Sequence, residues 1–217
     1  MRRVRPEGVV FDLDGTLVDS RLDLAAGVNA TRKSLRFPPL AVETIAAMVG
    51  EGARTLLQRA LPDSVAGEAF EAALALFLDL YFERCLDATP AYPGIPELLA
   101  ALSPRLPLAV LTNKPERHSR RILDGLGLAK HVGLLIGGDT FATRKPDPAG
   151  LVHIAARWNT TPERLLLVGD SDVDVATARA AGTPVALVGW GFGSLDRAAP
   201  SGAWHVDSAA ELLSGLR

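Results

Sequence analysis

Two groups of closely spaced acids in the 217-residue sequence have side chains that can do chemistry. The first lies in Asp12-Leu13-Asp14-Gly15-Thr16, where Gly15 permits a sharp turn that brings Asp12 and Asp14 toward one site. Such a pair can divide the work between a nucleophile or metal ligand and a general acid and base. A solvated turn is the structural alternative, because Asp and Gly are common turn residues.

The second group is Gly169-Asp170-Ser171-Asp172-Val173-Asp174, at the expected junction of a strand and a helix. Asp and Ser also cap helices, but one acid is sufficient for a cap. Three acids this close repel one another unless a cation or a basic group is near. The segment therefore favours a hard divalent cation held by oxygen ligands, and Mg²⁺ is the usual one beside a phosphate.

Two further loops carry groups that bind anions. Leu111-Thr112-Asn113-Lys114 supplies a hydroxyl, an amide and main-chain N–H groups, although by itself this segment is also typical of an ordinary loop. Lys145 is one of only four lysines among 23 basic residues, and prolines on both sides of Asp147 stiffen the loop that carries it. A rigidly held lysine indicates a point charge for phosphate or for a pair of carboxylates.

These groups follow short, continuous apolar runs, a pattern that predicts strands buried on both faces of a parallel sheet. The predicted strands are Val9–Phe11, Leu108–Leu111, Leu165–Val168 and Val185–Val188, with a short further strand at Trp204–Val206 before a closing helix from Ser208. Helical patterns alternate with them at Ile95–Leu102, Pro115–Leu126, Pro148–Trp158 and Val173–Ala181. This order predicts a doubly wound α/β sheet of the Rossmann-like kind, which binds ligands at the carboxyl ends of its strands.

The alternation breaks between the first strand and Thr89–Gly94, a proline- and glycine-containing linker. The intervening chain is rich in Ala and Leu and predicts helices at Leu22–Leu35, Val42–Met48, Ala53–Leu61 and Gly67–Leu86. An insertion at this point lies above the strand ends, where it can act as a lid. We therefore expect a core domain of residues 1–18 and 90–217 and a helical cap of residues 19–89.

The composition narrows the class of partner. With a formal net charge of −2, the chain has no electrostatic footprint for nucleic acid or for an anionic membrane. Hydrophobic residues make up 48% of the chain, but no apolar stretch approaches the ~18 residues of a membrane span. The single cysteine, Cys85, cannot form an internal disulfide and is expected to be a buried, unreactive thiol. These features favour a cytoplasmic location.

Taken in order, four segments resemble the motifs of the haloacid dehalogenase superfamily of phosphotransferases, and the insertion resembles its α-helical cap. They are D12-L13-D14-G15-T16-L17, T112-N113, K145-P146-D147-P148 and G169-D170-S171-D172-V173-D174. The resemblance covers nearly the whole chain. Further segments are similar to those of the bacterial phosphoglycolate phosphatases within this superfamily: Leu17-Val18-Asp19-Ser20, Val49-Gly50-Glu51-Gly52-Ala53, Thr112-Asn113-Lys114-Pro115 and Ile136-Gly137-Gly138-Asp139.

The resemblance implies a phosphatase that works through an aspartyl-phosphate. Asp12 would attack phosphorus, and Asp14 would protonate the leaving oxygen and then activate water. Mg²⁺ would be held by the Asp12 carboxylate, the Asp14 carbonyl and Asp170. Lys145 would neutralise charge, and Thr112 and Asn113 would donate to phosphoryl oxygens.

Two positions of the fourth motif receive different expectations. Asp174 is expected to orient Lys145 or a metal-bound water rather than to bind the metal itself. Asp172 lies at a variable position of this motif and receives no role.

The substrate is expected to be a small phosphorylated metabolite, with 2-phosphoglycolate first. Gly50-Glu51-Gly52-Ala53-Arg54 begins a predicted cap helix and could close over a carboxylate with help from Arg54 or Lys114. A plain turn with a solvated Arg54 is the structural alternative. Pyrophosphate, nucleotides and sugar phosphates remain open as substrates, and so does a phosphomutase. The sequence does not indicate an oligomeric state.

A protein of another class, the receiver-domain phospho-Asp switch, also has an acceptor Asp, a hydroxyl residue and a lysine at strand ends. It lacks a carboxylate two positions after the acceptor and a helical insertion behind it, and both are present here. A dehalogenase is disfavoured as well, because that reaction needs neither Asp14 nor the acidic fourth motif.

Overall fold

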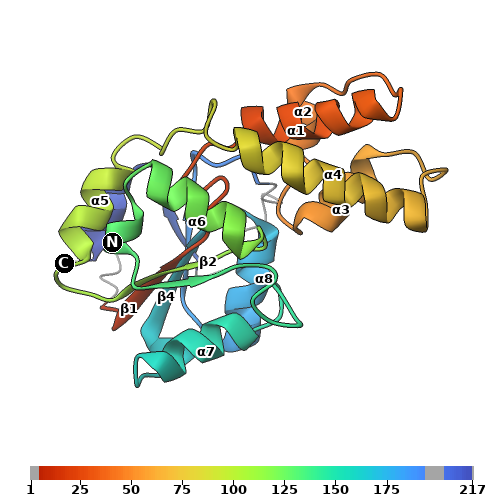
Figure 1. The fold of residues 1–217 in the computed structure, drawn as a ribbon. Helices are drawn as coiled ribbons and strands as arrows, with labels where there is room; N and C mark the ends of the chain where they lie inside the picture. Colours follow the sequence, from red (N-terminus) through yellow and green to blue (C-terminus); the bar gives the residue numbers. More distant parts are fainter. Residues whose placement is uncertain (1–4, 194–202, 217) are drawn as a thin grey trace.

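The computed structural model describes residues 5–193 and 203–216, and its central element is a six-stranded, all-parallel sheet in the order β3-β2-β1-β4-β5-β6 (Figure 1). The strands are β1 (Gly8–Phe11), β2 (Leu108–Leu111), β3 (Leu134–Ile136), β4 (Leu165–Gly169), β5 (Val185–Val188) and β6 (Trp204–Val206). The predicted doubly wound α/β fold is confirmed. Residues 1–4, 194–202 and 217 of the predicted core lie outside the described residues.

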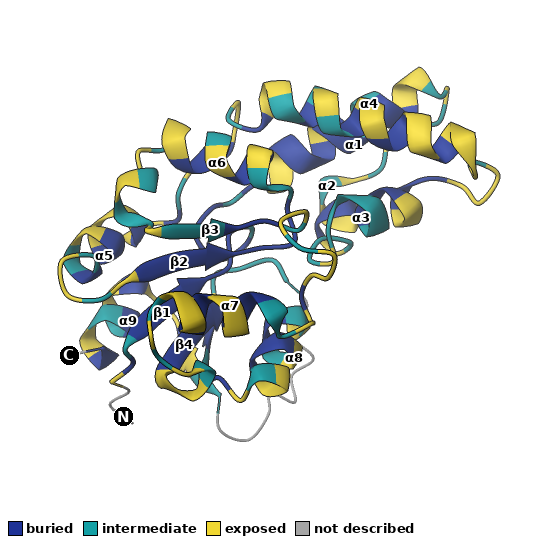
Figure 2. Cartoon of the chain, turned by 60° about the horizontal axis from the view of Figure 1, so that its bottom comes forward, coloured by how far each residue is buried: buried dark blue, intermediate teal, exposed yellow. Residues whose placement is uncertain are grey.

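The apolar strand runs are explained by burial on both faces of the sheet. In β1, Val9 and Phe11 contact one hydrophobic cluster, whereas Val10 contacts the other. Because side chains alternate between the faces of a strand, a strand with two covered faces must be apolar at every position. Figure 2 shows the central strands β1, β2 and β4 in the colour of buried residues, with the helices exposing their outer surfaces.

Helices cover both faces of this sheet. One face is packed against α5 (Ile95–Leu102), α6 (Glu116–Gly125) and α9 (Ala209–Gly215). The opposite face is packed against α7 (Ala149–Arg157) and α8 (Asp172–Ala181). Short 3₁₀ turns, η1 (Ala129–His131) and η2 (Pro162–Arg164), precede β3 and β4. All of the helices predicted for the core are present, with ends shifted by a few residues.

The remaining helices form a separate layer beside the carboxyl end of the sheet (Figure 1). They are α1 (Arg21–Ser34), α2 (Val42–Ala46), α3 (Ala53–Ala60) and α4 (Glu68–Arg84). All four fall within the segment 19–89 that we propose as the cap domain. None of the helices in the described part of the chain has the length and apolar character needed to cross a membrane.

Two linkers join these helices to the sheet, and they run side by side. The N–H of Tyr92 donates to the carbonyl of Leu17 at 3.0 Å, and the N–H of Asp19 donates to the carbonyl of Pro90 at 3.0 Å. Asp23, at the start of α1, accepts hydrogen bonds from the Ala88 N–H and the Thr89 hydroxyl. The entry and exit of the insertion are therefore tied to each other.

Candidate active site

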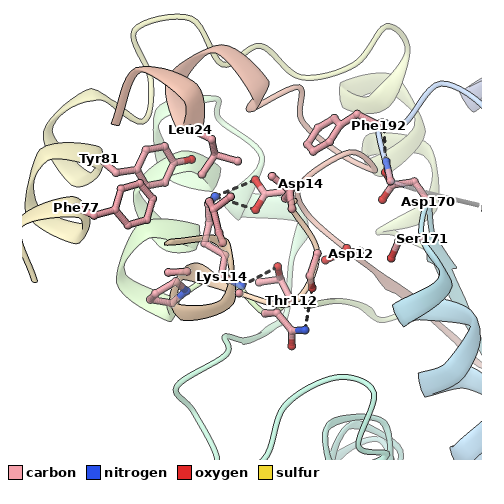
Figure 3. Close-up of a pocket in the computed structure, with 18 of the residues that line it drawn as sticks. Asp12, Asp14, Leu24, Phe77, Tyr81, Thr112, Lys114, Asp170, Ser171 and Phe192 are labelled. Atoms are coloured by element: carbon pink, nitrogen blue, oxygen red, sulfur yellow. Dashed lines mark hydrogen bonds and ion pairs between the residues drawn. The ribbon is translucent and has the colours of Figure 1, made fainter. Parts of the chain in front are cut away.

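The four polar segments predicted from the sequence meet at the carboxyl ends of β1, β2 and β4. Here the sheet and the cap helices together enclose a pocket (Figure 3). On the sheet side its lining is polar: Asp12, Asp14, Thr112, Asn113, Lys114, Asp170 and Ser171. On the cap side the side chains are mainly apolar: Leu24, Val49, Ala53, Leu56, Phe77, Leu78 and Tyr81.

Lys145 joins two acids below this pocket. Its Nζ lies 2.9 Å from Oδ1 of Asp12 and 2.7 Å from Oδ1 of Asp174, and all three side chains are buried. Burial alone lowers the pKa of Lys145, but the charges of Asp12 and Asp174 outweigh it and raise this pKa above its ordinary value. The lysine therefore stays charged and holds both acids in place.

Asp174 uses both of its carboxylate oxygens inside the protein. Oδ1 accepts from Lys145, while Oδ2 accepts from the N–H of Ser171 at 3.1 Å and from its hydroxyl at 2.7 Å. Ser171 precedes the first turn of α8, so Asp174 also stabilises the start of that helix. The capping alternative considered for this motif and the contact with Lys145 are thus both realised in one side chain.

Both carboxylate oxygens of Asp170 accept hydrogen bonds from neighbouring loops. Its Oδ2 accepts from the N–H groups of Phe192 at 3.1 Å and Gly193 at 2.7 Å, and its Oδ1 accepts from the Thr16 hydroxyl at 3.2 Å. Gly15 has φ +83°, and a Cβ there would lie 2.1 Å from Oδ2 of Asp170. Only glycine fits at position 15, because any side chain would displace the carboxylate.

The carboxylates of Asp12, Asp170 and Asp174 form a buried cluster, with ligand atoms within 4.8 Å of one another. Burial, reinforced by Asp174 and Asp12, raises the pKa of Asp170 to about 8. Burial also raises the pKa of Asp12 to about 6, although Lys145 opposes this shift. The charge of Lys145 therefore offsets only part of the burial and mutual repulsion of these acids. These oxygen ligands suit a hard divalent cation.

Asp14 forms an ion pair with Lys114 on the wall of the pocket, whereas Asp12 is bound to Lys145. Its oxygens lie 2.9 Å and 2.8 Å from Nζ of Lys114, and the Ser20 hydroxyl donates to Oδ1 at 2.5 Å. Figure 3 shows this ion pair between the strand end that carries Asp12 and the cap residue Tyr81. The sequence motif places both acids on the same pocket, but it does not reveal the lysine that binds the second one.

The two predicted phosphate-binding residues of the loop after β2 differ in their surroundings. Thr112 is buried at the pocket, and its hydroxyl oxygen accepts from the Lys114 N–H at 3.3 Å. Asn113 uses its side-chain NH₂ group on the carbonyls of Gly50 and Lys145, each at 2.9 Å. The Asn113 amide therefore links the cap loop to the lysine loop, and its two donor hydrogens are both in use.

Arg54 is the one predicted site residue that the structure places away from the pocket. It makes a two-bond ion pair with Glu71 of α4 at 2.7 Å and 2.8 Å, and its guanidinium lies over the ring of Phe70. Both charged side chains are well exposed. Leu56 and Leu57 fill the inner face of α3, so Arg54 projects outward, as in the solvated alternative.

The cap side contributes residues that sequence reasoning did not select. Phe77 and Tyr81 line the pocket from α4, with ring centroids 5.9 Å apart and planes inclined by 10°. Leu24 of α1 and Phe192, from the loop after β5, line it as well. Nothing distinguishes these residues locally from ordinary core positions, because the cap helices are apolar along most of their length.

The chain belongs to the haloacid dehalogenase-like hydrolase family, whose model matches residues 6–182, and the family expected from the four motifs is thereby confirmed. Among its relatives, a phosphoglycolate phosphatase of Chromobacterium violaceum is 42% identical over 213 residues, covering 95% of this chain and 94% of that protein. A phosphoglycolate phosphatase of Rhodospirillum rubrum is 43% identical over 195 residues, covering 86% and 81%.

The fold is also similar to solved structures. A crystal structure from Haemophilus somnus, described as a predicted phosphoglycolate phosphatase, superposes with a TM-score of 0.90 at 30% sequence identity. The match covers 99% of this chain and 98% of the other. The likeness therefore includes the cap helices as well as the sheet.

Proposed function

We propose that the protein is a Mg²⁺-dependent phosphatase that hydrolyses 2-phosphoglycolate through an aspartyl-phosphate on Asp12. The observation that carries this proposal is the buried Asp12 carboxylate, ion-paired to Lys145 and clustered with Asp170 at the carboxyl end of the sheet. The choice of substrate is supported by the printed names of the relatives that share about two fifths of its sequence.

Asp12 has the properties of a nucleophile at neutral pH. With a pKa raised to about 6 by burial, its carboxylate is mostly ionised at pH 7 but is poorly solvated. The N–H of Leu13 at 2.7 Å and Lys145 at 2.9 Å both bind Oδ1, which orients the group. Attack on phosphorus would form the Asp12–phosphate bond as the bond to the leaving oxygen breaks.

We propose Asp14, which lines the same pocket, as the acid and base in the two halves of the reaction. It would give a proton to the departing glycolate oxygen and then take one from the water that hydrolyses the aspartyl-phosphate. Lys145, Thr112 and the main chain of the loop after β2 would face the negative charge of the phosphoryl group.

The metal site is proposed from the same cluster. Asp12, Asp170 and the main-chain carbonyl of Asp14 would hold Mg²⁺, whereas Asp174 is already bound to Lys145 and Ser171. When bound, the ion would supply positive charge that neutralises the acids and the phosphoryl oxygens. Asp174 would then act as the residue that positions Lys145.

The cysteine content and the net charge of the chain bear on where the protein acts and on what kind of partner. We propose a cytoplasmic enzyme acting on a small metabolite, because the single cysteine is a buried free thiol and the charge is nearly balanced.

The proposal is tested with the purified protein and Mg²⁺. Phosphate release from 2-phosphoglycolate would be compared with release from pyrophosphate, nucleotides and sugar phosphates. We expect the highest kcat/KM for 2-phosphoglycolate and a loss of at least about 10³-fold in Asp12→Asn. Faster turnover of one of the other substrates would contradict the substrate assignment, and normal turnover in Asp12→Asn would contradict the nucleophile.

A further inference from the structure

The hydroxyl of Tyr81 is a buried polar group at the pocket, and none of the described residues pairs with it in a regular hydrogen bond. Tyr81 is only 2% exposed and lines the pocket from α4, and its hydroxyl makes no hydrogen bond of regular geometry within the described residues. The Ser20 hydroxyl, which donates to Asp14, is its nearby polar neighbour and has the smallest of the influences on its pKa. Burying a donor without a partner is unfavourable, so such a group at a ligand pocket indicates a ligand that accepts its hydrogen bond.

The Tyr81 ring is held so that the hydroxyl keeps its direction. The ring stacks on Phe77 and, at 5.6 Å and 8°, on the buried imidazole of His118 in α6. Burial, reinforced by the charge of Asp14, raises the pKa of Tyr81 well above its ordinary value, so the hydroxyl remains a donor. Figure 3 shows the hydroxyl pointing toward Lys114 rather than away from the pocket.

Lys114 supplies the charge that complements this donor. Its Nζ lies 4.6 Å from the centroid of the Tyr81 ring and 2.8 Å from Asp14, and the lysine is buried. Among the described residues that line the pocket, Lys114 has the only cationic side chain. Lys145, below the pocket, is already shared by Asp12 and Asp174.

The rest of the cap wall disfavours substrates that carry many hydroxyl groups. Around Tyr81 the described cap residues are Leu24, Val49, Ala53, Leu56, Phe77 and Leu78, whose side chains offer no hydrogen bonds. The hydroxyl groups of a sugar or nucleoside would lose their hydrogen bonds to water against this wall. One ammonium and one hydroxyl match a single small anionic group.

We infer that Lys114 and Tyr81 form the subsite for the carboxylate of the substrate, an inference that rests on the proposed phosphatase function. The carboxylate takes over Lys114 from Asp14 and accepts a hydrogen bond from Tyr81. Asp14 is then released from its ion pair at the moment when a substrate with a carboxylate is bound. Binding of the substrate carboxylate to Lys114 is therefore the same step that frees Asp14 to act as the acid and base.

The test compares two substrates that differ only at the carboxylate. In ethyl phosphate a methyl group replaces the carboxylate of 2-phosphoglycolate, while the phosphate ester is the same. The variants are Tyr81→Phe, which removes only the hydroxyl, and Lys114→Met. Values of kcat and KM would be measured for both substrates with the Mg²⁺-loaded protein, and thermal unfolding would show whether each variant is folded.

We expect the ratio of kcat/KM for 2-phosphoglycolate to that for ethyl phosphate to fall about 10-fold in Tyr81→Phe and about 100-fold in Lys114→Met. If Lys114→Met does not fold, the result from Tyr81→Phe decides. Matched controls are Tyr92→Phe and Lys130→Met. The Tyr92 hydroxyl is also buried without a partner in the described part of the chain but lies outside the pocket lining, and Lys130 is on the surface. Both controls should leave the ratio unchanged.

The contradicting results separate this inference from the proposed function. Equal losses on the two substrates in Tyr81→Phe, or the same change of ratio in Tyr92→Phe, would overturn the carboxylate subsite while leaving the phosphatase in place. A wild-type protein that hydrolyses both substrates equally well would do the same. A wild-type protein that hydrolyses neither would overturn both.

Discussion

The two sides of the pocket differ in the chemical character of their side chains: the sheet side is charged and polar, and the cap side is mainly apolar. On the sheet side, buried acids and Lys145 are held by ion pairs and by short hydrogen bonds from the main chain. On the cap side, aliphatic and aromatic side chains surround the Tyr81 hydroxyl, for which the described residues offer no regular hydrogen bond. The charged Lys114 lies where the two sides meet, bound to Asp14 and close to Tyr81.

We infer that the sheet side of the pocket carries out the reaction, whereas the cap side determines which substrate is preferred. Positioned charges stabilise the transferring phosphoryl group whatever it is attached to, so the sheet side suits any phosphomonoester. An apolar wall discriminates by what it cannot hydrogen-bond, and a few polar groups then set the preference. Changes on the sheet side should therefore reduce the rate for all substrates, while changes on the cap side should alter their order.

Among the substitutions that test this division between the two sides, the largest effect is expected from Lys145→Met. The substitution removes the charge that Asp12 and Asp174 share and leaves two buried acids in contact. We expect kcat to fall on the order of 10²–10³-fold for 2-phosphoglycolate and ethyl phosphate alike. Steady-state kinetics on both substrates would measure this, and a loss confined to one substrate would contradict the division between the two sides.

Asp170→Asn should give a smaller loss of rate, about 10²-fold at saturating Mg²⁺, together with a distinctive pH dependence of stability. In metal-free wild type the pKa of Asp170 is raised from 3.8 to about 8, chiefly by burial. A group with a raised pKa stabilises the folded protein below its unfolded pKa, and this contribution is lost as the pH rises through the folded value.

The Tm difference between Asp170→Asn and wild type in EDTA should therefore shift in favour of the variant between pH 5 and pH 9. Thermal unfolding across this range would measure it. In wild type, Mg²⁺ should bind more tightly as the pH rises toward 8, because the ion then displaces fewer protons. A Tm difference that is constant with pH would contradict the assignment of the raised pKa to Asp170.

A moderate effect is expected from Gly15→Ala. The new Cβ would lie 2.1 Å from Oδ2 of Asp170, and residue 15 has φ +83°. We expect about a tenfold loss of kcat/KM and a destabilisation of about 1–3 kcal/mol. The control is Gly67→Ala in the cap, where φ is +56° but no atom lies within 4 Å of the new Cβ. It should be destabilised without losing activity, and equal activity losses would show that backbone strain alone explains the effect.

The smallest effect is expected from Arg54→Ala. The ion pair with Glu71 is exposed and screened by solvent, so it contributes little to stability, and the guanidinium lies outside the described pocket lining. We expect KM for 2-phosphoglycolate to change by less than about twofold. A large rise in KM would restore the expectation, drawn from the sequence, that Arg54 binds the substrate carboxylate.

The sequence predicts the sheet side of this molecule better than the cap side, for a physical reason. Residues such as Asp12 and Asp170 follow apolar strands, and parallel strands bring their carboxyl ends together, so spacing along the chain predicts proximity. The edge strand β3 is missing from the prediction, although it is no shorter than β6, which the sequence does predict.

On the cap side, the direction of each side chain depends on how the helices pack. The position of Arg54 two residues after Gly52 suggested a ligand, but the packing of Leu56 and Leu57 turns it outward. Tyr81 gave no signal in an apolar helix, and the role that we infer for it rests on a hydroxyl that makes no regular hydrogen bond within the described residues.

The central claim is that Asp12 carries the phosphoryl group during turnover. Brief incubation of the Mg²⁺-loaded protein with ³²P-labelled 2-phosphoglycolate, followed by acid quenching and peptide mapping, tests it most directly. The account predicts label on the peptide that contains Asp12, sensitive to alkali as an acyl phosphate is, and none in Asp12→Asn. Label that persists in Asp12→Asn, or a wild-type protein that turns over under these conditions without becoming labelled, would contradict it.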